Sequence, residues 1–216
     1  MIKAILLPIL ALALAVLSAQ IARAQGTVYI SSLGPPSAGS ASVGSDSWLA
    51  AGFGTGTNAG GYLLNSVQLA LTNALGNPSG FTAMIYNEVG GKAPTPGSSL
   101  GTLSGSLDPV ANGIYTYSPA SSLTLLPNTA YFIVLTAGTP VTNGAYEWGF
   151  TSSSPPLSSD GWHEEAGFTS SSDGLHWLGF TAASAQFAIS ATDVPEPSTL
   201  ALLALGGFFL IRHRRK

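Results

Sequence analysis

Short runs in which apolar and polar residues alternate recur along the middle of this chain, with Pro, Gly and Asn between them. In residues 67–71 every second side chain is Val or Leu, and residues 81–86 alternate in the same way through Phe81, Ala83 and Ile85. A period of two residues is that of a β-strand with one buried face. The pattern continues in residues 114–117, 122–125, 130–136, 145–150 and 185–191. The chain is therefore restricted to a fold of many short strands joined by turns.

The segment from residue 25 to residue 193 shows no amphipathic helical period, and its length suits one domain with a substantial core. About ten short strands with long Gly- and Ser-rich connections predict an all-β domain, an antiparallel β-sandwich of jelly-roll type. Residues 130–136 are apolar at consecutive positions, which predicts a central strand. Its neighbour is either the strand at 67–71 or the strand at 81–86.

Charge is scarce in this domain and mostly negative. It carries one basic residue, Lys92, against nine acidic residues, which gives a formal charge of −8. Nucleic acid is therefore a poor partner, because affinity for a phosphate backbone depends on Lys and Arg. The chain has no cysteine, which excludes disulfides, thiolate nucleophiles and zinc–thiolate sites.

Residues 1–24 have the parts of a secretory signal peptide: a basic start, an apolar run and a small-x-small ending. Ala22 and Ala24 supply the small residues of the cleavage site. Signal peptidase would leave Gln25 as the new N-terminus. We therefore expect an exported protein.

Residues 194–216 contain three parts of different character. The two prolines at the start break any preceding strand, because each lacks the N–H that a ladder needs. Residues 198–211 carry no charge and predict a short hydrophobic helix near the lower limit of a transmembrane segment. Residues 212–216 form a basic tail that favours a cytoplasmic C-terminus, with the cations Arg212, Arg214, Arg215 and Lys216.

A Pro-Glu-Pro triplet, a short apolar segment and a terminal Arg/Lys cluster together resemble the PEP-CTERM sorting signal of bacterial surface proteins. The residues that match the signal are Val194, Pro195, Glu196, Pro197 and Ser198. The resemblance implies recognition and processing by an integral-membrane exosortase in bacteria that also make exopolysaccharide. It implies a membrane-anchored precursor that reaches the cell surface or the extracellular matrix. An ordinary C-terminal anchor is the alternative.

Several motifs in the body of the chain resemble the choice-of-anchor R family, in which an extracellular β domain is joined to different anchoring tails. These motifs lie at residues 44–50, 60–62, 65–69, 97–100, 126–131 and 159–162. A sorting tail after such a domain is an expected pairing. The resemblance implies no activity that can be assigned to individual residues.

Two copies of an Asp-x-x-His motif offer the most site-like chemistry, Asp160 with His163 and Asp173 with His176. Two carboxylates and two imidazoles can surround a metal ion, although Asp-Gly is also a common turn dipeptide. No metal or cofactor is predicted, since neither copy matches an established ligand spacing.

Glu147, Asp160, Glu164 and Glu165 are numerous enough for the acid and base of a glycoside hydrolase. Glu164 and Glu165 are adjacent, so they point to opposite faces of a strand and cannot form that pair together. No Gly-x-Ser-x-Gly elbow is present. The acids are therefore expected on a solvated edge, and the protein is predicted not to be an enzyme.

Four tryptophans are the remaining candidates for a binding role. Trp148 is expected in the core together with at least one other. Trp162 and Trp177 both follow Asp-Gly turns, and exposed rings beside hydroxyls there would bind neutral polysaccharide. The favoured function is a non-catalytic surface or matrix protein, with an exopolysaccharide-binding module and a glycan-active hydrolase as alternatives.

Overall fold

The computed structural model describes residues 26–90, 94–152, 157–179 and 183–196. These residues form 14 strands and contain no helix, and each pairing between the named strands is antiparallel. The predicted all-β, antiparallel class is confirmed.

The strands follow one another with turns and longer connections between them. In chain order they are β1 (Thr27–Ser31), β2 (Gly39–Val43), β3 (Trp48–Gly54), β4 (Tyr62–Gly76), β5 (Thr82–Val89), β6 (Thr95–Ser104), β7 (Gly113–Pro119), β8 (Thr124–Leu125), β9 (Ala130–Thr136), β10 (Gly144–Thr151), β11 (Leu157–Ser158), β12 (His163–Ser171), β13 (Ser184–Ala185) and β14 (Phe187–Asp193).

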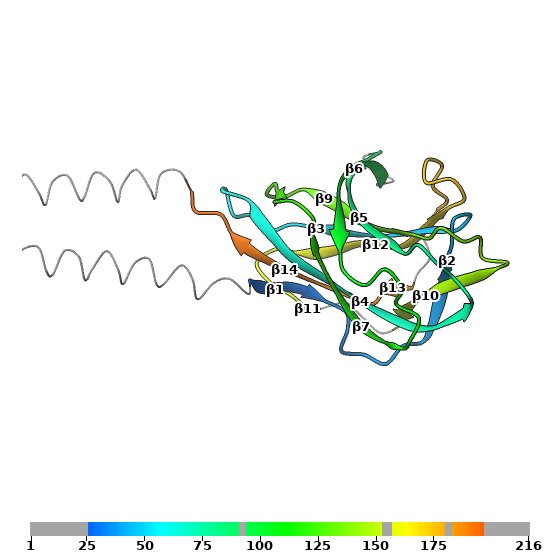
Figure 1. Ribbon diagram of the computed structural model, residues 1–216. Coiled ribbons are helices and arrows are strands. Elements are labelled where there is room, and N and C mark those ends of the chain that lie inside the picture. The colour runs from blue at the N-terminus through cyan, green and yellow to red at the C-terminus, as the bar shows by residue number, and fades with distance from the viewer. Residues whose placement is uncertain (1–25, 91–93, 153–156, 180–182, 197–216) are drawn as a thin grey trace, which may run out of the picture.

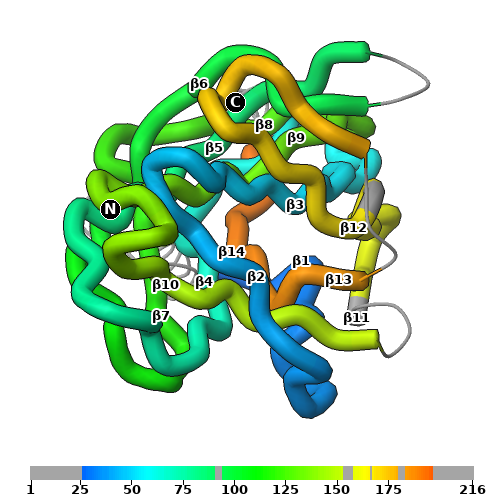
Figure 2. Tube along the Cα trace, turned by 90° about the vertical axis from the view of Figure 1, so that its right-hand side faces the viewer, coloured from blue at the N-terminus to red at the C-terminus, as the bar shows by residue number. Residues whose placement is uncertain are grey.

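The strands are arranged in two layers around a common core (Figure 1). One layer contains β1, β14, β4, β10 and β2, and the other contains β6, β5, β9, β3 and β12. A pairing between β6 and β7 joins the two layers along one side. The tube view shows the chain curving around the core (Figure 2). On the far side from that joint, β12 is the last strand of its layer.

The alternation in the sequence places the predicted side chains in the core. Val67, Leu69 and Leu71 of β4 are at most 1% exposed. Strand β9 is buried on both faces and lies between β5 and β3, so it is central as predicted. Its neighbour is the strand at 81–86, which forms β5; the alternative neighbour, 67–71, is wrong because it belongs to β4 in the other layer.

A second, smaller cluster covers the outer face of the layer that contains β9. Phe132 and Val134 of β9 point into this cluster, because successive side chains of a strand point to opposite faces. Its members are Ala50, Met84, Phe132 and Val134, with Trp48, Tyr86 and Trp177 packed against them. The outer face of this layer is therefore partly covered by the domain's own side chains over these strands.

The described chain enters and leaves the domain at the same end. Strand β1 pairs with β14, and Thr27 lies opposite Ala191 (Figure 1). The predicted signal peptide, the hydrophobic segment 198–211 and the basic tail 212–216 lie outside the described residues. Within the described ranges, no helix has the length and apolar character needed to cross a membrane.

Candidate functional site

The predicted sorting signal begins at Val194, one residue after the last strand of the domain ends. Strand β14 is held between β1 and β4 and finishes at Asp193. The backbone N–H of Val194 donates to the carbonyl of Gly61 at 3.0 Å. Pro195 and Glu196 follow and are exposed, whereas Pro197 and Ser198 lie outside the described residues. The signal is thus joined to the folded domain without an intervening linker.

A tight turn at Asn58 to Gly61 holds this junction. The side-chain amide of Asn58 donates to the carbonyl of Gly61 at 2.6 Å and to the carbonyl of Val194 at 3.1 Å. Gly61 has a φ of +76°, a conformation that favours glycine. Gly60 must also lack a side chain, because a Cβ there would lie 2.0 Å from the carbonyl oxygen of Val194. We call Asn58, Gly60 and Gly61 the tail clamp.

Asp193 adds a side-chain contact to the same junction. Its Oδ1 accepts a hydrogen bond from the Tyr29 hydroxyl at 2.6 Å. Burial, with this carboxylate as the next cause, raises the pKa of Tyr29 far above its ordinary range. Tyr29 therefore stays a hydrogen-bond donor and ties the end of β14 to β1.

Trp162 lies in the core directly beneath this end of the domain, and the prediction that it is an exposed sugar platform is wrong. Its side chain is 1% exposed and stacks on Tyr29 with a centroid distance of 4.9 Å. The Asp-Gly turn is present as predicted, with positive φ at Asp160 and Gly161 and a bond from Trp162 N–H to Ser159 O. Trp162 directly follows this turn, and its indole points into the interior of the domain.

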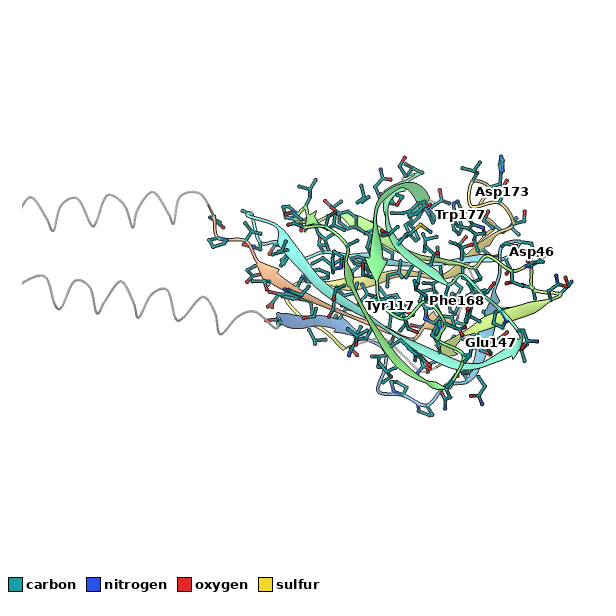
Figure 3. All side chains as sticks on the ribbon, viewed as in Figure 1. Asp46, Tyr117, Glu147, Phe168, Asp173 and Trp177 are labelled. Carbon is teal, nitrogen blue, oxygen red and sulfur yellow. The ribbon has the colours of Figure 1, made fainter. Side chains whose placement is uncertain are left out.

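Trp177 is half-buried on the opposite end of the domain (Figure 3). It packs against the outer cluster of the β9 layer rather than standing free on a loop. Its indole Nε1 is buried without a hydrogen-bond partner. A role for Trp177 in sugar binding stays a prediction. Trp148 is fully buried, as expected, and donates from Nε1 to the carbonyl of Gln186 at 3.1 Å.

The second Asp-x-x-His copy forms a closed turn. Asp173 Oδ1 accepts the backbone N–H groups of Leu175 and His176, and Oδ2 lies 2.6 Å from His176 Nδ1. These bonds, that of the His176 backbone first, hold the pKa of Asp173 well below its usual range. The carboxylate is thus occupied by its own loop.

The two Asp-x-x-His copies do not share a site. Asp160 precedes β12 and Asp173 follows it, and the nine residues of that strand separate them by about 30 Å at ~3.3 Å per residue. In the part of the chain that the structure describes, no three His, Cys, Asp or Glu residues gather as metal ligands. The alternative in which both copies surround one ion is not supported.

Glu147 is buried, not on the solvated edge predicted for the acids. It is 6% exposed, and its two oxygens accept hydrogen bonds from Ser42 at 2.5 Å and Ser40 at 2.7 Å. Both serines lie on β2, which pairs with β10 beside Glu147. The carboxylate therefore links two strands.

Glu164 and Glu165 point to opposite faces of β12, as the sequence predicts. Glu165 lies 2.9 Å from His163 Nε2, whereas Glu164 Oε2 accepts from the Ser184 hydroxyl at 2.6 Å. Burial raises the pKa of Glu164, and its Oε1 has no hydrogen-bond partner. Glu164 thus connects β12 to β13 across the side on which the layers are less tightly joined.

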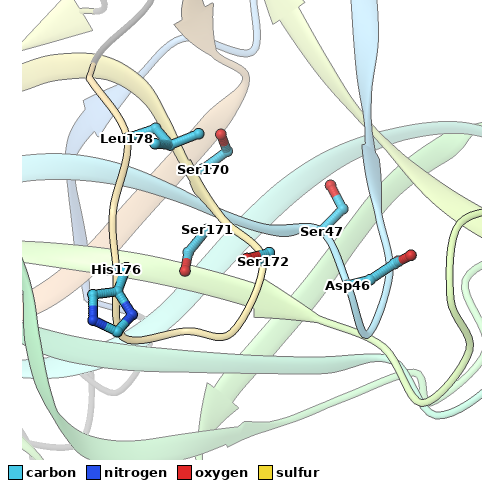
Figure 4. A pocket seen from close by; sticks show the side chains of 7 residues that line it. All are labelled: Asp46, Ser47, Ser170, Ser171, Ser172, His176 and Leu178. Atoms are coloured by element: carbon cyan, nitrogen blue, oxygen red, sulfur yellow. The ribbon is translucent and has the colours of Figure 1, made fainter.

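A hollow opens between the two layers beside β12. Its larger part has a volume of about 490 Å³, and Phe150, Phe168, Ser42 and Thr169 are among its lining residues. Ser47 and Ser170 also border a smaller part of about 260 Å³, where Asp46, Ser171, Ser172, His176 and Leu178 complete the wall (Figure 4). Asp46 and Asp173 lie at the end of the domain away from the exit of β14 (Figure 3). The part of the hollow that Asp46 borders therefore lies at the end of the domain away from the sorting signal.

Sequence reasoning missed both the tail clamp and the hollow. The clamp has a local signal, since Asn and Gly with one residue between them mark a turn, but its contact with Val194 spans 136 residues. The hollow has no local signal, because β2, β3, β10 and β12 each contribute only part of its wall.

Comparison with known proteins identifies the tail and nothing else. Residues 193–216 match the model described as the PEP-CTERM protein-sorting motif. Neither a curated protein nor a solved structure matches the chain. The chain therefore carries an exosortase sorting signal, and this signal marks it as an exported protein with a membrane-anchored precursor that reaches the cell surface.

Proposed function

We propose that the protein is a non-catalytic component of the cell surface or extracellular matrix, with an extracellular domain of the choice-of-anchor R type. Signal peptidase removes residues 1–24, and the exosortase processes the precursor at the Pro-Glu-Pro signal. The observation that carries this proposal is the junction at Asp193 and Val194, where the matched motif begins on the last residue of a core strand. Recognition of the tail therefore delivers the entire folded domain.

Three of the described carboxylates support a non-catalytic role, because each is engaged within the domain. The oxygens of Glu147 bind two serines, Asp173 binds its own turn, and Glu164 bonds to Ser184. A general acid and base must instead reach a substrate atom across an open site. These three acids are used to hold strands and loops together. Release of reducing sugar from the host's polysaccharide by purified protein would contradict the proposal.

Substitution of Glu196 tests the sorting part of the proposal. Glu196 is exposed and belongs to the Pro-Glu-Pro triplet, so Glu196→Gln should leave the fold intact and the precursor in the membrane fraction. Glu88→Gln removes the same charge from β5 and should be sorted like the wild type. Normal release of the Glu196→Gln protein would refute recognition through the triplet.

A second candidate function is binding of neutral polysaccharide in the hollow beside β12. Aromatic faces next to hydroxyl groups suit sugar rings, and the partly exposed Phe150 lies there with Ser42 and Ser47. The charge of −8 on the domain disfavours anionic polymers at low salt. Asp46 at the border of the hollow lies at the end of the domain away from the sorting signal, so this part would remain open on anchored protein.

One phenylalanine variant and one tryptophan variant separate the two possible sugar sites. Phe150→Ala should weaken retention on the host's exopolysaccharide if the hollow binds it, because Phe150 is partly exposed there. Trp177→Ala should weaken retention if the outer cluster binds it. Wild-type retention by both folded variants would refute binding through either set of rings.

A further inference from the structure

The sorting motif and the folded domain overlap at two residues. The matched motif begins at Asp193, which is the last residue of β14 and lies opposite Tyr62 of β4. Its second residue, Val194, is held by the tail clamp. The start of the signal is therefore part of the domain's own hydrogen-bond network.

Both backbone groups of Val194 are occupied within the domain. Its N–H donates to Gly61, and its carbonyl accepts from the Asn58 side chain. The clamp is rigid in turn, because Gly61 N–H donates to Asn58 O at 2.8 Å and Asn58 N–H donates to the Tyr62 hydroxyl at 3.0 Å. An enzyme that binds an extended chain uses these same backbone groups.

We propose that the tail clamp restrains the sorting signal, so that processing requires Val194 to leave Asn58 and Gly61 first. This inference rests on the proposed exosortase processing. The single N–H of Val194 cannot donate to Gly61 and to an enzyme cleft at the same time. The fraction of molecules with the clamp open therefore sets how often the start of the signal is available.

Pulse–chase labelling of the full-length precursor in the exosortase-containing host tests this proposal. Asn58→Ala removes the side-chain donor to the carbonyls of Val194 and Gly61. It should speed the loss of the tail by at least about five-fold, the factor expected for the bond to Val194 alone at ordinary strength. Asn73→Ala is the matched control, because Asn73 Oδ1 holds the N–H of Asn112 near the far end of β4. Its processing rate should equal that of the wild type.

Gly60→Ala provides an independent lesion that removes no donor. The added Cβ would lie 2.0 Å from the Val194 carbonyl oxygen, so it must displace the tail and should also speed processing. Faster processing of either variant, with Asn73→Ala unchanged and the domain resistant to protease, supports the clamp. Unchanged or slower processing of folded Asn58→Ala and Gly60→Ala overturns it. Failure of the wild type to lose its tail would instead refute the proposed function.

Discussion

Truncation of Trp162 should be among the most damaging single changes in this domain. The indole is 1% exposed, stacks on Tyr29 at 4.9 Å, lies parallel to Phe53 at 6.1 Å and meets Tyr62 edge-on at 4.9 Å. Loss of a buried Trp or Phe side chain typically costs about 3–5 kcal/mol. Trp162 Nε1 is buried without a partner, which already costs the native state part of that gain. We therefore expect Trp162→Ala to lower the free energy of unfolding by about 3 kcal/mol.

Urea unfolding of residues 25–196, followed by circular dichroism, measures this loss. Trp162→Phe should be much milder, within about 1.5 kcal/mol of the wild type, because it keeps a ring and removes the unpaired donor. Trp177→Ala should cost about 1–2 kcal/mol, since that ring is only half-buried. A loss below about 1 kcal/mol for Trp162→Ala would contradict its place in the core.

Three further predictions concern the carboxylates. The raised pKa of Glu164 means that, above its ordinary value of 4.5, the folded protein binds more protons than the unfolded chain. The free energy of unfolding should therefore fall as the pH rises through this region. Urea titrations at several pH values should show that Glu164→Gln removes this fall. The lowered pKa of Asp173 has the opposite effect: the ionised carboxylate stabilises the fold above its ordinary pKa of 3.8, and this stability should be lost as the pH falls below that value. Asp173→Asn should lack this pH dependence. Glu147→Ala should cost about 1–3 kcal/mol by leaving Ser40 and Ser42 without their acceptor, and an unchanged urea midpoint would refute that role.

The sequence predicts the strands whose apolar residues alternate and the consecutive apolar run at 130–136, and β3 shows why another strand escapes. Its sequence is rich in Ala and Gly, and Gly52 must be small because a Cβ there would lie 2.9 Å from the Cβ of Glu165 and 3.0 Å from the ring of Phe132. This requirement comes from β12 and β9, which are far away in the sequence. Local patterns therefore identify strands rich in large apolar residues and miss a strand such as β3, whose residues are small because its neighbours pack closely.

The candidate site also has one part that the sequence predicts and one part that it does not. The Pro-Glu-Pro signal is contiguous, so its residues are recognisable from the sequence alone. The inward position of Trp162 depends on two residues with positive φ and on three aromatic partners from β1, β3 and β4. The same Asp-Gly-Trp letters fit an exposed loop equally well. What an indole contacts is decided by strand packing, which one sequence does not specify.

Intact-mass spectrometry of the protein at its final location tests the sorting and export of this chain most directly. We predict a mature form that begins at Gln25 and lacks residues 200–216, because both ends carry processing signals. An intact basic tail on protein recovered from the surface of cells with a working exosortase would contradict processing at the PEP-CTERM signal.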